Sequence, residues 1–311
     1  MATEGMRFGA LYGFCLGACL SGIQLALGWI DPPPAVEVVS ETSAFVALPP
    51  KPDGAREAGD GEGVVYTEEG CLAYTGDVRD ACFHALALQR AGKDAVGGQA
   101  ACERIGEDPL RWECIADVAE LYWPADRATS EAICPTIGKK KWRDQCWFNL
   151  ALAASRIDYD YARRMCGEAG MWRDFCYHDV NGEIAQVEPA AALAWCDLEQ
   201  GELLRRKTCY HGLGKYLGRT DPGAARGICE QVPTSNPLYP ENCHHGIGWA
   251  MAETRGSAAL EDCSKSGKYR DSCTLGVSAH AKRLDRGEAL RICGEVSRDD
   301  LRQRCEAFAN R

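Results

Sequence analysis

Cysteine is the residue type in this chain whose number and spacing could do chemistry. Eighteen cysteines are present in 311 residues, and sixteen of them fall between Cys71 and Cys305. Such a set could form disulfides, bind zinc or remain as reduced core thiols. Zinc sites usually carry close C-x₂₋₄-C pairs, and no such pair occurs after residue 19. Because oxidising compartments favour disulfides, we expect disulfides and a domain that lies outside the cytoplasm.

Two alternating spacings divide these cysteines into eight pairs. The members of a pair lie 10 to 14 residues apart, whereas 20 residues always separate the second member from the next first member. Bridges within pairs use all sixteen cysteines, while bridges across the 20-residue arms leave Cys71 and Cys305 without partners. Parity favours the first scheme, and spacing alone leaves both open. The bridges predicted by the first scheme are Cys71–Cys82, Cys102–Cys114, Cys134–Cys146, Cys166–Cys176, Cys196–Cys209, Cys229–Cys243, Cys263–Cys273 and Cys293–Cys305.

The 20-residue arms carry the periodicity of helices. An apolar residue follows each second cysteine by four positions, as Leu86 and Ile247 do. Alanine precedes the first cysteine by four positions in five consecutive repeats, from Ala162 to Ala289. Four positions are about one helical turn, so each arm is expected to be a hairpin of two short helices. We predict an all-α fold: a disulfide-stapled α-solenoid of about eight helical hairpins over residues 66–311.

A short motif marks the expected start of the first helix in several hairpins. It reads Trp142-Arg143-Asp144 in one repeat and Tyr269-Arg270-Asp271 in another, followed by one residue and then the second cysteine. Aspartate suits the positively charged first turn of a helix. We therefore expect this helix to begin near the second cysteine.

Histidine placement is the feature that most suggests a binding surface. Four of the six histidines stand two residues after a second cysteine, and three of these follow a tyrosine or another histidine. The candidate binding residues are His84, Tyr177, His178, Tyr210, His211, His244 and His245. Equivalent positions in a repeat array form a ladder, which could fill polar slots between helices, bind a protein or peptide, or bind a small molecule or metal. A shared metal is disfavoured because neighbouring helices usually lie about 8–10 Å apart.

Sequence motifs for catalysis or for a cofactor are missing. The chain has no G-x-S-x-G elbow, P-loop, dinucleotide fingerprint or H-E-x-x-H zinc motif. We expect no catalytic residue, no metal site and no cofactor, with a hydrolase site that lacks a motif as an alternative. The formal charge of -10 leaves no basic half, so a nucleic-acid partner is not expected.

An uncharged segment precedes the repeats. After a short tail of residues 1–7, residues 8–30 carry no charge and are long enough to cross a bilayer core of about 30 Å. We expect a transmembrane anchor, with a lipoprotein signal that modifies Cys19 and a cleaved secretory signal as alternatives. Gly9, Gly13 and Gly17 have the spacing of close helix contacts in membranes, which would suit a homodimer.

Residues 31–65 lie between this segment and Cys71, the first cysteine of the repeats. Proline, glycine and acidic residues dominate them, and they show no apolar periodicity. Such a composition cannot bury enough surface to fold, so a disordered linker is expected.

The repeat motifs resemble those of a known family. A-x-x-x-C is present from Ala289 to Cys293, and C-x-x-G is present at Cys209–Gly212, Cys243–Gly246 and Cys273–Gly276. In architecture, these motifs resemble the Sel1-like cysteine-rich helical repeats, a branch of the tetratricopeptide-type solenoids. The resemblance implies binding on a concave face and transfers no catalytic residue. The expected function is a membrane-tethered scaffold that faces the periplasm or cell surface, if the source is bacterial, and binds a protein or peptide partner.

Overall fold

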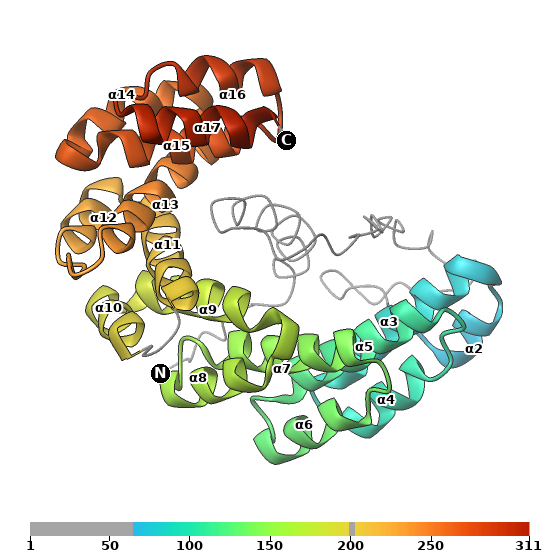
Figure 1. Cartoon of the computed structure of the whole chain (residues 1–311). Helices are drawn as coiled ribbons and strands as arrows, with labels where there is room; N and C mark the ends of the chain where they lie inside the picture. The colour runs from blue at the N-terminus through green and yellow to red at the C-terminus, as the bar shows by residue number, and fades with distance from the viewer. Residues whose placement is uncertain (1–64, 199–202, 311) are drawn as a thin grey trace, which may run out of the picture. The chain divides into compact units, whose positions relative to one another are not determined.

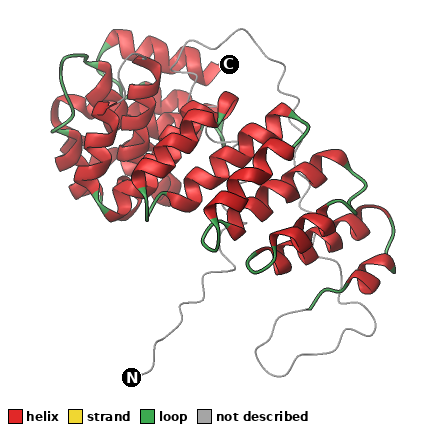
Figure 2. Cartoon of the chain, turned by 90° about the horizontal axis from the view of Figure 1, so that it is seen from below, coloured by secondary structure: helices red, strands yellow, loops and turns green. Residues whose placement is uncertain are grey.

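The computed structural model describes residues 65–198 and 203–310, which belong to two compact units. Every regular element of these two ranges is helical, and Figure 2 shows no strand in them. The predicted all-α class is therefore confirmed. No helix within the two ranges is both long and apolar enough to cross a bilayer.

Several expectations concern the N-terminal part of the chain, which lies outside the described residues. They are the tail 1–7, the membrane segment 8–30 with Gly9, Gly13, Gly17 and Cys19, and the linker 31–65 except for Val65.

The helices alternate in length along both units (Figure 1). In residues 65–198 they are α2 (Glu68–Leu72), α3 (Gly76–Ala91), α4 (Ala95–Cys102), α5 (Asp108–Tyr122), α6 (Arg127–Ile133), α7 (Lys140–Ala154), α8 (Tyr159–Glu168), α9 (Arg173–Val187) and α10 (Pro189–Leu198). In residues 203–310 they are α11 (Leu203–Thr220), α12 (Pro222–Cys229), α13 (Leu238–Arg255), α14 (Leu260–Cys263), α15 (Arg270–Ala281), α16 (Arg286–Cys293) and α17 (Asp299–Asn310). Short 3-10 turns join some of them at Cys134–Thr136, Gly170–Trp172, Gly256–Ala259 and Ser264–Tyr269.

Each repeat pairs a long helix with a short one. We call the helices that contain the second cysteine of a pair A helices (α3, α5, α7, α9, α11, α13, α15 and α17) and the others B helices. Within residues 65–198, α3, α5, α7 and α9 lie side by side, each packed on the next (Figure 1). Within residues 203–310, α11, α13, α15 and α17 do the same. These rows support the predicted helical repeats.

The A helices are longer than the cysteine spacing predicted. They begin three to six residues before the second cysteine, as α5 does at Asp108 and α15 at Arg270, and have 12 to 18 residues. The expectation that each of these helices begins near the second cysteine and is short was therefore wrong, because the helix also includes the residues before that cysteine and, in several repeats, part of the preceding loop. The B helices start as their sequence suggests. In five repeats an aspartate twelve residues after the second cysteine caps the B helix, as Asp94 does by accepting a hydrogen bond from Gly97 N at 2.9 Å.

Disulfides join the end of a B helix to the next A helix, as the first pairing scheme predicted. The bridges are Cys71–Cys82, Cys102–Cys114, Cys134–Cys146, Cys166–Cys176, Cys229–Cys243, Cys263–Cys273 and Cys293–Cys305, with Cα–Cα distances of 5.4 to 5.6 Å. Cys196 and Cys209 are also disulfide-bonded. None of these sixteen cysteines is more than 2% exposed. Closing a loop of this size contributes about 3 kcal/mol each in the chain-entropy model.

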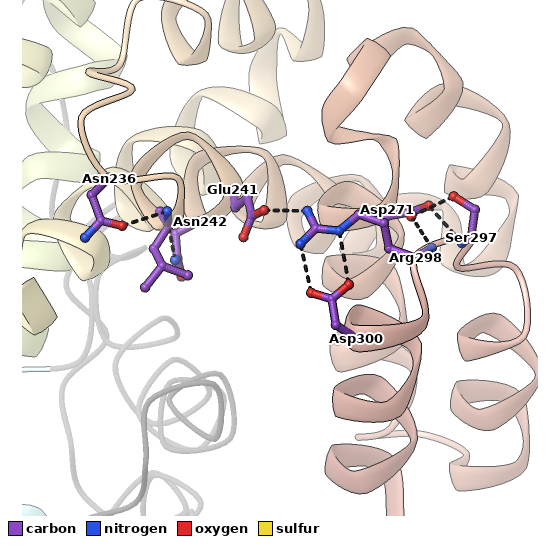
Figure 3. A network of polar contacts seen from close by, with 8 residues as sticks. Asn236, Glu241, Asn242, Asp271, Ser297, Arg298 and Asp300 are labelled. Carbon is purple, nitrogen blue, oxygen red and sulfur yellow. Dashed lines mark hydrogen bonds and ion pairs between the residues drawn. The ribbon is translucent and has the colours of Figure 1, made fainter.

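The aspartate of the Arg-Asp motif links successive repeats. Asp174 and Asp271 lie in the first turns of α9 and α15, as expected, whereas Asp80 lies in the second turn of α3. Its carboxylate accepts hydrogen bonds from Gly106 N and Glu107 N, which precede α5 in the next repeat, at 3.0 to 3.1 Å. Asp271 accepts from Ser297 N, Ser297 Oγ and Arg298 N before α17 in the same way (Figure 3). The carboxylate therefore fixes the position of the neighbouring loop.

An arginine three residues before the second cysteine, with or without a following aspartate, makes a hydrogen bond within its own disulfide loop. Its guanidinium donates to the carbonyl oxygen six residues earlier, from Arg111 to Ile105 at 3.1 Å and from Arg173 to Gly167 at 2.7 Å. Arg143 and Arg302 make the same contact. Because these carbonyls lie in the loop between the two cysteines, the bond orders a segment that no helix holds.

Glycines allow the A helices of residues 203–310 to touch through their backbones. The C-x-x-G motif extends to C-x-x-G-x-G in two repeats, ending at Gly214 and Gly248. A Cβ on Gly248 would overlap the carbonyl oxygen of Cys273 on α15, and a Cβ on Gly276 would overlap that of His245 on α13. The α13–α15 contact is thus closer than any side chain permits.

This contact gives a test of the fold. Gly248→Ala should lower the free energy of unfolding by about 1–3 kcal/mol, because α13 and α15 must separate to admit the methyl group. Gly227→Ala is the matched control: Gly227 lies in α12 with no atom within 4 Å of an added Cβ, so it should gain up to about 1 kcal/mol from helix propensity. Urea denaturation of both variants measures the difference. Equal stability of the Gly248→Ala variant and the parent would contradict the packing.

Candidate functional site

A chain of polar side chains crosses three successive A helices in residues 65–198. His84 Nε2 on α3 lies 3.0 Å from Asp117 Oδ2 on α5. The other oxygen of Asp117 accepts a hydrogen bond from Asn149 Nδ2 on α7 at 3.4 Å, and Gln145 Nε2 donates to Asn149 Oδ1 at 2.8 Å. We call these four residues the polar row. It is a continuous path of hydrogen bonds that runs across the hairpins rather than along one of them.

Repeat position explains why these side chains meet. Asp117 and Asn149 both stand three residues after a second cysteine, and His84 stands two residues after one. The apolar residue at position four is buried in the same helices, with Leu86 at 2% and Val118 at 0% exposed. Positions two and three therefore lie beside the packed face, where neighbouring A helices approach each other.

Two glutamates extend the polar row along α5. Glu113 and Glu120 lie four residues before and three residues after Asp117, so the three carboxyl groups share one face of the helix. Burial and the charge of Asp117 raise the pKa of Glu113, and the same causes raise the pKa of Glu120 to about 8. Near neutral pH, Glu120 therefore keeps its proton in most molecules.

His84 responds to the same carboxylates in the opposite sense. Burial favours the neutral ring, but the hydrogen bond and charge of Asp117 outweigh it and raise the pKa of His84. The face thus combines an ion pair with carboxyl groups whose ionisation is unfavourable. A positive charge placed beside Glu113 and Glu120 would relieve this repulsion, so the face can bind a cation or exchange protons.

A second polar cluster centres on Trp249 of α13. The indole Nε1 donates to Glu253 Oε1 at 2.9 Å, and Arg219 Nε on α11 donates to Glu253 Oε2 at 2.6 Å. Lys215 Nζ lies 5.3 Å from the centre of the Trp249 ring. Burial raises the pKa of Glu253, but its bonds to Arg219 and the charge of Lys215 prevail and lower it. The carboxylate is surrounded by its own partners, so this cluster serves packing rather than acid–base chemistry.

The predicted histidine and tyrosine positions lie inside the packed units. Apart from His84, none of the seven candidate binding residues is more than 7% exposed. In three repeats the ring of the residue directly after the second cysteine packs against another ring. The distances between ring centres are 5.2 Å for Tyr177 and Trp195, 5.3 Å for Tyr210 and Tyr239, and 4.6 Å for His244 and Tyr269. His178 lies 2.6 Å from Asp179. A binding role for this ladder stays a prediction, and only His84 belongs to the polar row.

Two neighbouring histidine rings of the ladder lie closer together than the usual distance between helices predicted. The rings of His211 and His245 are 5.1 Å apart between centres, not 8–10 Å. The reason is the glycine contact between α11 and α13, where a Cβ on Gly246 would overlap the carbonyl oxygen of His211. Even so, no group of three or more His, Cys, Asp or Glu in the described ranges is placed to hold a metal ion.

Sequence reasoning missed Glu113, Asp117, Gln145 and Asn149. The signal that could have revealed two of them is their repeat position. Three consecutive repeats place Asp117, Asn149 and Asp179 three residues after the second cysteine, where the next three place glycine. A polar residue retained at a helix contact predicts a hydrogen-bonded partner there.

The buried histidines give a pH test. Burial, followed by the charge of Arg226, lowers the pKa of His244 to about 4. Below pH 6.5 the unfolded chain gains a proton at this residue that the folded chain does not, so stability should fall with pH from about 6.5 to about 4. His244→Tyr, which restores the residue of two other repeats, should remove about 3 kcal/mol of that loss.

The measurement is the free energy of unfolding at several pH values in a buffer without phosphate. His84→Gln is the control, because a raised pKa stabilises the fold at low pH and its contribution is lost as the pH rises through that pKa. The difference in the free energy of unfolding between His84→Gln and the parent should therefore stay constant as the pH falls below 6.5. A constant difference between His244→Tyr and the parent would contradict the assignment.

Comparison with known proteins adds no assignment to this geometry. No protein-family model matches the chain, and no curated protein or solved structure is similar to it at a significant level.

Proposed function

We propose that this protein is a membrane-tethered scaffold that holds a basic protein or peptide segment outside the reducing cytoplasm. In this proposal residues 8–30 anchor the chain and the hairpins stack as an α-solenoid, as in the Sel1-like repeats that the motifs resemble. The observation that carries the proposal is the polar row with its two glutamates. Its half-buried members are His84 on α3 and Asp117 on α5, with the two glutamates beside Asp117, whereas Asn149 and Gln145 on α7 are buried. Side chains on neighbouring helices are what a repeat protein offers to an extended partner.

Charge supports a basic partner. Residues 65–198 carry 14 Lys and Arg against 22 Asp and Glu, whereas residues 203–310 carry 17 against 13. The acidic excess therefore belongs to the unit that contains the polar row. Opposite charge on a partner would steer its approach and select against acidic segments.

The buried disulfides support a location outside the cytoplasm. Sixteen disulfide-bonded cysteines favour an oxidising compartment, because disulfides are rare where thiols are maintained reduced. Tethering by residues 8–30 would then place the repeats outside the cytoplasm, in the periplasm or at the cell surface if the source is bacterial.

Peptide binding tests the proposed partner class. The full chain in detergent is titrated with a lysine-rich peptide and with a glutamate-rich peptide of the same length, at low and high salt. The lysine-rich peptide should bind and weaken with salt, because exposed charges are screened. The double variant Glu113→Gln with Glu120→Gln should lose affinity by about tenfold, or about 1.4 kcal/mol.

The matched control removes two exposed carboxylates of the same unit. Asp77→Asn with Asp160→Asn removes more negative charge than the glutamate variant, because Glu120 is mostly protonated near neutral pH, but leaves the polar row intact. If this control weakens binding as strongly as the glutamate variant, binding depends on net charge and the assigned face is wrong. Binding of neither peptide would contradict the partner class.

Thiol counting tests the compartment. Protein isolated from its native source and denatured without reductant should show no alkylation between residues 71 and 305, and reduction should then expose sixteen thiols. Mass spectrometry of the alkylated peptides gives the count. Alkylation of most of these cysteines before reduction would overturn the extracytoplasmic location.

A further inference from the structure

Two adjoining repeats each have a polar residue at a buried position that other repeats fill with an apolar or aromatic side chain. The third residue after the first cysteine is apolar and buried in five repeats, where it fills the disulfide loop. These residues are Ile105, Ile137, Ala169, Val232 and Val296. In one repeat the position is Ser266, which is 6% exposed. In the preceding repeat, His244 on α13 follows the second cysteine where two other repeats have tyrosine, and it is 1% exposed.

The polar atoms at these positions have no hydrogen-bond partner among the described residues. They are Ser266 Oγ and both ring nitrogens of His244, and Nη1 of Arg226 is a third such group. A buried polar group without a partner costs about 1–3 kcal/mol. Native proteins seldom keep several such groups together unless water or an ion joins them.

The fold brings Arg226 near His244, and Ser266 lies three residues before the ring on which His244 stacks. Arg226 lies one turn before Cys229 at the end of α12, and the Cys229–Cys243 bridge joins that end to α13, where His244 is the next residue. The ring of His244 stacks on Tyr269, 4.6 Å away, which ends the 3-10 turn that contains Ser266. Arg226 is close enough for its charge to act on the imidazole of His244.

Carboxylates in the neighbourhood already have other partners. Glu241, one turn before His244, accepts a hydrogen bond from Arg298 Nη1 at 2.7 Å (Figure 3). Asp262, just before the same 3-10 turn, is ion-paired with Arg255 and Lys265. Neither acid neutralises Arg226 in the structure.

We propose that Arg226, His244 and Ser266 form a binding site for a small oxyanion such as phosphate, sulfate or a carboxylate group. All three offer hydrogen-bond donors: a guanidinium N–H, an imidazole N–H and a hydroxyl. A guanidinium that carries a permanent charge selects an anion over a cation or a neutral ligand. Arg226 and Tyr269 are half-buried, so both side chains reach solvent next to the buried His244 and Ser266. This anion site does not depend on the proposed basic partner, and its residues lie in residues 203–310, the unit that does not contain the polar row.

Nuclear magnetic resonance of the histidine rings tests the site in the full chain. The resonance of His244 is assigned by its loss in His244→Gln, and its pKa is measured with increasing inorganic phosphate, sulfate or acetate at constant ionic strength. A bound anion favours the imidazolium, so at least one of these ions should raise the pKa of His244 saturably by about one pH unit or more. A response to phosphate and sulfate indicates a tetrahedral ion, and a response to acetate alone indicates a carboxylate. No saturable response to any of them overturns the site.

Three variants separate the site from a general charge effect. Arg226→Gln should raise the pKa of His244 without anion, because a positive neighbour is removed, and should abolish the anion response. Ser266→Ala should weaken anion binding severalfold. Lys268→Gln removes an exposed positive charge from the same 3-10 turn and should leave anion affinity unchanged.

Two outcomes would contradict the assignment even if the ion binds. A full response in Arg226→Gln or Ser266→Ala would show that other groups hold the anion. A loss in Lys268→Gln as large as in Arg226→Gln would show that only local positive charge matters. Arg226→Lys, which keeps the charge but not the fork of donors, distinguishes a misfolded variant from a lost contact, since it should fold and bind with reduced affinity.

Discussion

The disulfide between the end of each B helix and the next A helix is the constraint on which the architecture depends. The B helices have between four and ten residues, and helices this short are marginal in water without tertiary support. The bridge holds together the two ends of the loop that separates two hairpins. An arginine such as Arg111 orders the inside of this loop by donating a hydrogen bond to the carbonyl oxygen six residues earlier. An aspartate such as Asp80 then connects the hairpin to the loop of the next repeat. Covalent and polar contacts at one edge thus add to the apolar contacts that short hairpins make with one another.

Packing between A helices follows a different rule in each unit. In residues 203–310, glycines at Gly214, Gly246, Gly248 and Gly276 bring backbones together, and side chains at the adjacent positions are forced into contact. The 5.1 Å separation of His211 and His245 is a consequence of that approach. In residues 65–198, Asp117 and Asn149 occupy a glycine position, so the helices meet through hydrogen bonds. The same repeat position therefore gives close packing in one unit and a polar row in the other.

The sequence predicted the elements whose signal repeats and missed those that depend on a single contact. Cysteine spacing and parity predicted the bridges, and the residue four positions from each cysteine predicted the buried faces, because both signals recur in nearly every repeat. Helix starts were placed too late, since a cysteine marks a bridge and not a helix end. The polar row escaped notice because His84, Asp117 and Asn149 lie about 32 residues apart in the chain and meet only when A helices are adjacent. The histidine ladder was visible, but nothing in its spacing showed that the rings would be buried.

Departures from the repeat are therefore more informative about function than the repeat itself. A position that is apolar in five loops and becomes serine in one, beside an unpartnered histidine, is not required by the hairpin, which forms without it elsewhere. The same argument applies to the polar row, where three repeats accept charged or amide side chains at a contact that glycine fills in others. Each substitution costs stability through burial of a polar group, and the disulfides supply enough stability for the fold to tolerate that cost. A scaffold stabilised by covalent bridges can thus place polar groups at helix contacts that a purely apolar repeat could not accommodate.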